Sequence, residues 1–303
     1  MANHPPLELI RERKLADLVS VPSGVVLEAS GVIVKGRDYF VVFDNMRSVA
    51  RIGHGLRPGS DRHAWVGRPR QGEGYEDVAH SARLRRFYLL IEARKHPDGS
   101  YKAVIEEYDD GWRLKARCWV DVPFQTKNRG FEGLAVVAGR VGEHLLALCE
   151  GNSGLAGRKG RTPGGGRMHV LEKSGRTWRS VAIVALPPEL DFEDYSAVAV
   201  RGRTLAIVSQ TSGRLWVGTL RRSDWTIVDD GRTYELPRTE KGRRLYCTIE
   251  GVDWLAPRTL VMVSDLRKAG YPDRCARTDQ SIHVFRLPAR RARGTAGGTG
   301  RRP

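Results

Sequence analysis

Five short segments of this sequence place a serine or a glutamate at the head of an alternating apolar run. The five polar residues are Ser30, Glu76, Glu132, Ser196 and Glu250. They are separated by 46, 56, 64 and 54 residues, an interval that suits a repeated unit of four strands with its loops. In a ring of such units the innermost strands run along one central channel, so we expect the five side chains to face a common axis.

Carboxylates brought together in this way predict a cation site. Three glutamates held close to one another raise each other's pKa, because like charges repel. A hard cation would relieve the repulsion, and a shell of carboxylate, hydroxyl, carbonyl and water oxygens favours Ca²⁺ over zinc or copper. The alternative is a water-filled channel in which the same side chains bind water and backbone.

A second polar set follows the next apolar run of each repeat. Its members are Asp44, Glu92, Glu150, Gln210 and Asp265. We expect the four acids of this set, Asp44, Glu92, Glu150 and Asp265, to be catalytic groups that position water at one mouth of the channel. Basic residues come shortly after, and the candidates for binding a phosphorylated ligand are Arg47, Arg94, Arg214 and Arg267. Charged, solvated loop ends are the competing explanation.

The elements that must position these residues are β-strands. The second run of each repeat is almost continuously apolar, which is typical of strands buried on both faces. Fourth strands begin near a tryptophan and end near a proline, and we expect Trp112, Trp178 and Trp225 to pack between repeats. The last repeat lacks a fourth strand, and residues 15–22 are predicted to supply it and to close the ring.

The sequence therefore predicts an all-β chain, a five-bladed β-propeller of four-stranded blades spanning residues 15–288. Residues 1–14 are predicted to form an N-terminal arm, with one short helix candidate over residues 7–15. Residues 289–303, rich in arginine and glycine, are predicted to be a disordered basic tail.

Two phrases of the sequence carry a family resemblance. They are Gly130-Phe131-Glu132-Gly133-Leu134-Ala135 and Ile249-Glu250-Gly251-Val252-Asp253. With the repeats in register, the chain resembles the five-bladed calcium-activated nucleotidase (apyrase) propellers, and also bacterial phytase-like propellers. The resemblance implies one axial calcium ion held by the serines and glutamates of the innermost strands.

Composition limits the partners. The net charge of +16 favours anionic partners, which are phosphorylated small molecules, nucleic acid or an anionic surface, and charge alone does not choose among them. Scattered charges that only confer solubility are the competing explanation. The basic residues that follow the acidic set favour an anionic small molecule as the partner. Nucleic acid is disfavoured, because the recurring tryptophans are better explained by packing. No apolar stretch is long enough to span a membrane. The four cysteines lie far apart without a C-x-x-C pair, so we expect reduced thiols in a cytoplasmic protein. We also expect a monomer.

Two functions follow from these features. One is a metal-dependent hydrolase of a phosphorylated small molecule. The other is a non-catalytic propeller scaffold that binds a protein or a polyanion. Walker, G-x-S-x-G and H-E-x-x-H motifs are absent from the sequence, so the acidic residues are the main catalytic candidates.

Overall fold

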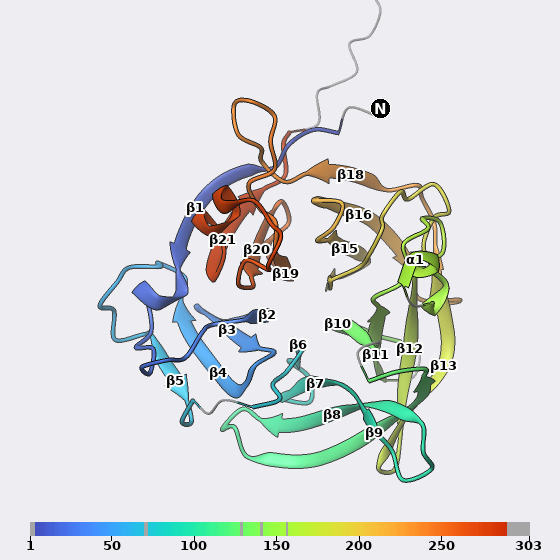
Figure 1. The fold of residues 1–303 in the computed structure, drawn as a ribbon. Helices are drawn as coiled ribbons and strands as arrows, with labels where there is room; N and C mark the ends of the chain where they lie inside the picture. The colour runs from blue at the N-terminus through green and yellow to red at the C-terminus, as the bar shows by residue number, and fades with distance from the viewer. Residues whose placement is uncertain (1–3, 70–71, 128–129, 140–141, 156, 290–303) are drawn as a thin grey trace, which may run out of the picture.

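The computed structural model describes residues 4–69, 72–127, 130–139, 142–155 and 157–289. In this part of the chain nearly all regular structure is β-strand, arranged around a common centre (Figure 1). The helical pieces described are α1 (Gly157–Gly160) and 3-10 turns at Leu15–Asp17, Asn152–Gly154 and Asp273–Arg277. The predicted all-β class is confirmed, while the predicted basic tail lies outside the described residues except for residue 289.

The described strands form five antiparallel meanders in chain order. The first contains β2 (Ala29–Lys35), β3 (Asp38–Phe43), β4 (Met46–Gly53) and β5 (Ala64–Val66). The second contains β6 (Asp77–Ser81), β7 (Arg86–Lys95), β8 (Tyr101–Asp109) and β9 (Leu114–Phe124). The third contains β10 (Phe131–Ala138), β11 (Glu143–Cys149), β12 (Arg167–Ser174) and β13 (Thr177–Ala185).

The fourth meander contains β14 (Ala197–Arg201), β15 (Thr204–Ser209), β16 (Arg214–Arg221), β17 (Thr226–Ile227) and β18 (Arg232–Glu235). The fifth contains β19 (Ile249–Ala256), β20 (Thr259–Ser264) and β21 (Ser281–Arg286), and is completed by β1 (Glu8–Lys14). The outer strands β13 and β9 also pair in parallel over two residues, which joins the second and third meanders into one eight-stranded sheet.

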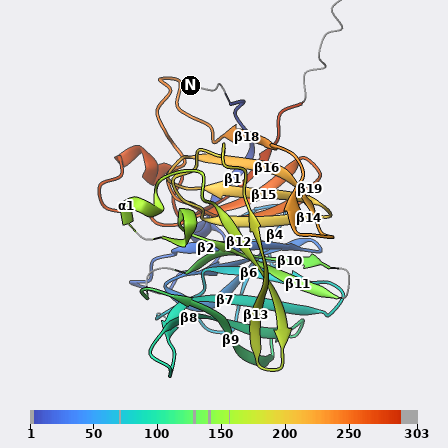
Figure 2. The ribbon, with the colours of Figure 1, turned by 90° about the vertical axis from the view of Figure 1, so that its right-hand side faces the viewer.

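The innermost strands form a circle. β2 contacts β6, β6 contacts β10, β10 contacts β14, β14 contacts β19, and β19 returns to β2. Figure 2 shows the ring from its side, with α1 and the red-orange connection between β20 and β21 protruding from the same face. This arrangement brings the N-terminal ends of all five inner strands to one axis.

The chain ends close the ring, but not with the residues predicted. β1 pairs antiparallel with β21 from Glu8↔Arg286 to Lys14↔Ser281. The predicted closing strand at 15–22 is wrong: Leu15–Asp17 is a 3-10 turn, and Leu15, Leu18 and Val19 are buried in the core. Residues 8–14 are mostly charged and exposed because β1 is the outer edge strand, so its sequence lacks the apolar pattern of a buried strand. Residues 8–14 therefore belong to the ring and not to a separate arm. The helix expected over residues 7–15 is also wrong, because Glu8–Lys14 is a strand.

The core lies between neighbouring meanders. β3, β11, β15 and β20 are buried along almost their whole length, as expected of strands covered on both faces. The predicted tryptophan packing is confirmed: each of three tryptophans meets an aromatic ring on the second strand of the preceding meander. These ring pairs, with their centroid distances, are Trp112–Phe40 (5.5 Å), Trp178–Tyr88 (5.6 Å) and Trp225–His144 (5.2 Å).

Candidate functional site

Three of the five residues predicted to face the axis occupy β-bulges. At the start of the pairing of β2 with β3, β10 with β11 and β19 with β20, the ladder skips one residue of the inner strand. The skipped residues are Ser30, Glu132 and Glu250. A bulge bends its strand and re-aims the side chain of the extra residue. The bulge therefore explains why the side chains of these three residues depart from the alternating directions of the other side chains in the same strand.

A glycine follows the bulge residue in each case, and close packing at the axis requires it. A Cβ atom on Gly133 would lie 2.9 Å from the backbone nitrogen of Val198 on the next inner strand. One on Gly251 would lie 2.9 Å from the Cα of Gly31. The glycines allow adjacent inner strands to approach, which narrows the ring and brings the acidic residues together.

The two predicted acidic sets form a single group, which we call the axial carboxylate cluster. Its members influence one another electrostatically, and they are Glu28, Asp44, Glu76, Glu92, Glu132, Glu150, Glu250 and Asp265. Seven of them belong to the predicted catalytic and metal-binding sets, and Glu28 is the additional member. The sequence therefore identified most of the cluster but separated it into two rings.

Burial and mutual repulsion perturb these groups strongly. Burial, followed by the charges of Asp265 and Glu250, raises the pKa of Asp44 to about 9. Burial and the neighbouring Glu92 and Glu250 raise the pKa of Glu76 to about 8. Burial and Glu250 raise the pKa of Asp265 to about 8. Burial with Glu76 and Glu150 raises the pKa of Glu132 well above its ordinary value.

The tightest part of the cluster includes a residue that the sequence analysis missed. One carboxylate oxygen each from Glu28, Asp44 and Asp265 lie within 4.8 Å of one another. The Oδ1 atom of Asp44 is buried and has no hydrogen-bond partner. Glu28 precedes β2 outside the repeated pattern, and its carbonyl accepts a 3.0 Å hydrogen bond from the Asp44 amide. That contact holds the two side chains on the same segment of the ring.

A lysine supplies positive charge inside the cluster. Lys268 Nζ lies 2.9 Å from Glu250 Oε1 and 3.7 Å from Asp265 Oδ2. Gln210 Nε2 donates to the same Glu250 oxygen at 2.7 Å. Gln210 follows β15 at the position where the other meanders carry an acid, so it supports the cluster without adding charge.

The two serines predicted as metal ligands make a different contact. Ser30 Oγ donates a 2.5 Å hydrogen bond to the Tyr75 carbonyl, and Ser196 Oγ donates a 3.1 Å bond to the Ile249 carbonyl. Tyr75 and Ile249 immediately precede Glu76 and Glu250. Each serine therefore fixes the start of the next inner strand, and with it the backbone that carries a cluster glutamate.

The four arginines predicted to bind substrate are engaged outside the cluster. Arg47 and Arg94 both contact Glu73, at 3.4 and 3.0 Å. Arg214 contacts Asp191 at 2.6 Å. Arg267 donates to the Tyr271 carbonyl at 2.7 Å, whereas its neighbour Lys268 reaches the cluster. Arg267 and Lys268 lie in a loop, where side chains do not alternate regularly as they do in a strand. The sequence therefore could not indicate which of the two points toward the cluster.

The prediction of four reduced cysteines is wrong for two of them. Cys247 and Cys275 form a disulfide, while Cys118 and Cys149 are buried free thiols. Cys247 lies three residues before Glu250, and Cys275 lies in the connection that carries Asp265 and Lys268. The disulfide thus joins two segments that contribute to the cluster. The two cysteines are 28 residues apart and belong to no recognisable motif, so the sequence did not indicate that they pair.

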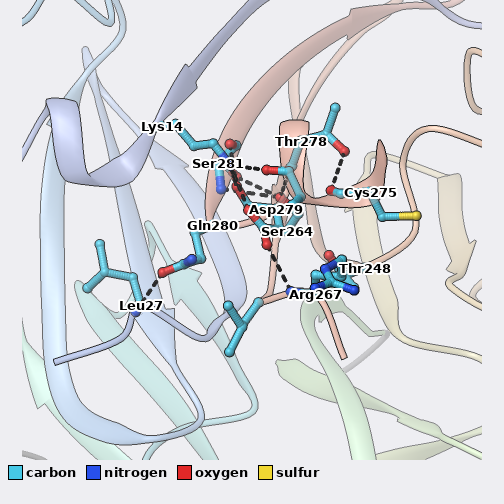
Figure 3. Close-up of polar contacts among 12 residues, drawn as sticks. Lys14, Leu27, Thr248, Ser264, Arg267, Cys275, Thr278, Asp279, Gln280 and Ser281 are labelled. Carbon is cyan, nitrogen blue, oxygen red and sulfur yellow. Dashed lines mark hydrogen bonds and ion pairs between the residues drawn. The ribbon is translucent and has the colours of Figure 1, made fainter. Parts of the chain in front are cut away.

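Hydrogen bonds hold the same connection on its other side (Figure 3). Ser264 Oγ donates to the Thr278 carbonyl at 2.5 Å, and Lys14 Nζ contacts Asp279 Oδ1 at 2.6 Å. Asp279 Oδ2 accepts a 3.0 Å bond from the Arg267 amide. The closing strand β1, through Lys14, therefore also supports the segment next to the cluster.

Comparison with known proteins identifies the fold. No protein family and no curated protein matches the chain. Among solved structures, Myxococcus xanthus glutaminyl cyclase is 11% identical, with a TM-score of 0.50, and the match covers 92% of this chain and 95% of that chain. The fold is a β-propeller.

Two further solved structures are similar to this β-propeller at lower TM-scores. The PQQ-bound aldose sugar dehydrogenase of Streptomyces coelicolor is 15% identical (TM-score 0.47; 93% of this chain, 99% of that chain). The RRP9 WD40 repeats are 12% identical (TM-score 0.45; 94% and 100%). These similarities concern the fold and do not indicate an activity for this chain. In the described residues, no helix has the length and apolar character needed to cross a membrane.

The cluster predicts an unusual pH dependence of stability in the presence of a chelator. Because the folded-state pKa values of Asp44, Glu76 and Asp265 lie above the ordinary values, the folded protein holds these protons more tightly than the unfolded chain. Stability should therefore fall as pH rises from 5 to 9. Urea unfolding in EDTA at pH 5, 7 and 9 measures this, and Asp44→Asn should reduce the slope. A wild-type midpoint that rises steadily over this range would contradict the prediction.

The disulfide predicts a second effect. Replacing both cysteines, Cys247→Ser with Cys275→Ser, should lower the free energy of unfolding by about 3.5 kcal/mol, because the crosslink no longer restricts the unfolded chain. A dithiol reductant should destabilise the wild type similarly and leave the double variant unchanged. Equal unfolding midpoints for reduced and oxidised wild type would count against the crosslink.

Proposed function

We propose that this protein is a five-bladed β-propeller that binds a hard divalent cation, first of all Ca²⁺, at the axial carboxylate cluster. The five meanders and the circle of inner strands support the blade count. The observation that carries cation binding is the approach of Glu28, Asp44 and Asp265 oxygens within 4.8 Å, with the buried Asp44 Oδ1 lacking a partner. A buried carboxylate oxygen without a hydrogen-bond donor is suited to bind a cation.

The donor chemistry agrees with calcium. The group contains carboxylate oxygens and neither thiolate nor imidazole, which disfavours zinc and copper. Calcium takes about six to eight oxygen ligands in flexible geometry. Lys268 contacts both Glu250 and Asp265, so the Glu250 carboxylate lies near Asp265. Glu250 thus adds a fourth carboxylate to the group of three. Ser30 and Ser196 have a supporting role in this proposal, because they hold the backbone of the cluster glutamates.

The resemblance to nucleotidase and phytase-like propellers extends this proposal to hydrolysis of a phosphorylated small molecule. A bound cation would supply charge to polarise a phosphoryl oxygen. Glu92 and Glu150, which influence Glu76 and Glu132, are the carboxylates left to orient an attacking water. Asp44 and Asp265, predicted as catalytic, are assigned to the cation. Lys268 provides the nearest positive charge for an anionic group.

Calcium binding is tested by thermal unfolding with and without calcium. We expect calcium in large excess to raise the melting temperature of EDTA-treated protein, by the equivalent of about 2.7 kcal/mol at one hundred times the Kd. Asp44→Asn should abolish this rise, because it removes the unpartnered oxygen from the group.

The matched control is Asp61→Asn, which removes an exposed aspartate in the connection between β4 and β5. This variant should keep the wild-type calcium response. A full response in Asp44→Asn, or none in the wild type, would be evidence against the site.

Hydrolysis is tested by phosphate release from nucleotides, sugar phosphates and inositol phosphates. We expect calcium-dependent release that falls by at least about 100-fold in Glu92→Gln or Glu150→Gln, since a positioned carboxylate is worth that much or more. Calcium binding without release from any substrate would favour the non-catalytic scaffold.

A further inference from the structure

Lys268 has an unusual position for an exposed surface lysine. Its side chain is 52% exposed, yet its ammonium group contacts Glu250 and Asp265, whose side chains are only 16% and 5% exposed. The four-carbon stem therefore reaches from solvent into the axial carboxylate cluster. Asp265 is shared, because it is also one of the three residues whose oxygens approach within 4.8 Å.

The backbone that carries Lys268 is fixed on both sides. The amide of Arg267 donates to Asp279, and the amide of Tyr271 donates to the Lys268 carbonyl at 3.1 Å. The Cys247–Cys275 disulfide holds the same connection farther along. Movement of the ammonium group thus requires rotation of the side chain and no rearrangement of the loop.

We propose that Lys268 is a tethered counter-cation that occupies the cluster when no divalent ion is bound and leaves when one binds. This inference rests on the proposed cation-binding function. A cation held by Asp265 would lie close to the ammonium group, and the two positive charges repel each other at that range. The tether keeps the ammonium at a high effective concentration beside Glu250.

The arrangement gives the site a means of selection. A monovalent ion brings no more charge than the ammonium it must displace, whereas a divalent ion brings twice as much. Lys268 should therefore exclude sodium and potassium while admitting calcium at a reduced affinity. It also compensates part of the carboxylate repulsion, which allows the metal-free ring to fold.

The first test is calcium titration calorimetry on three variants of the full chain. Lys268→Met retains the length of the side chain without its charge, Lys268→Arg retains the charge, and Lys241→Met removes an exposed lysine between β18 and β19. We expect Lys268→Met to bind calcium at least about tenfold more tightly than the wild type, while the other two stay within about threefold. Unchanged or weaker binding by Lys268→Met would overturn the proposal.

The second test needs no divalent ion and separates this inference from the proposed function. In EDTA and low salt, Lys268→Met should melt below the wild type, and sodium chloride should restore most of the difference by screening the carboxylates. Lys241→Met should show neither effect. If Lys268→Met matches the wild type at every salt concentration, Lys268 is not a counter-cation. If it behaves as expected but no protein binds calcium, the cation-binding function fails and the counter-cation role stands.

Discussion

Repulsion between carboxylates gathered at the axis is the constraint on which the rest of this structure depends. A propeller brings the start of every inner strand to one line, so an acidic residue repeated at that position becomes part of a crowded anionic group. The structure responds with Lys268, with the amide of Gln210, and with raised pKa values at Asp44, Glu76 and Asp265. Lys268 and the raised pKa values lower the net negative charge that the folded ring holds, and the Gln210 amide stabilises the Glu250 carboxylate by a hydrogen bond.

The polar residues of the inner strands divide into two roles that their sequence positions do not distinguish. Ser30 and Ser196 donate to backbone carbonyls of the neighbouring strand, and the buried Asp77 and Asp253 accept from the amides of Leu134 and Val34. These side chains join one inner strand to the next. The glutamates are thereby free to face the axis, since the connections between strands are made by other residues.

The sequence predicted what depends on local periodicity. Continuous apolar runs such as Leu145 to Cys149 identified buried strands, and the recurring tryptophans identified packing between meanders. It failed where the determining contact is distant along the chain. The charged residues 8–14 pair with β21 across the whole ring, and Cys247 meets Cys275 only because of the tertiary fold. Glu28 and Lys268 lie in connections without a period, so pattern alone could not place them in the cluster.

The parallel pairing of Trp119 and Val120 with Thr177 and Trp178 distributes strand pairing unevenly around the ring. Strand pairing continues from β6 through β9 and β13 to β10. Among the described residues, the named strands of the other neighbouring meanders are not paired with one another, and the fourth and fifth meanders are joined by the bridge of Pro6 with Glu235. We expect protection of amide protons from exchange to be shared by these two meanders, and the first opening motions to occur at boundaries without strand pairing. Glu132 belongs to this eight-stranded sheet, whereas Glu250 and Lys268 belong to the meander closed by β1. An opening at the boundary of the fifth meander would therefore change the distance between Glu132 and the pair formed by Glu250 and Lys268.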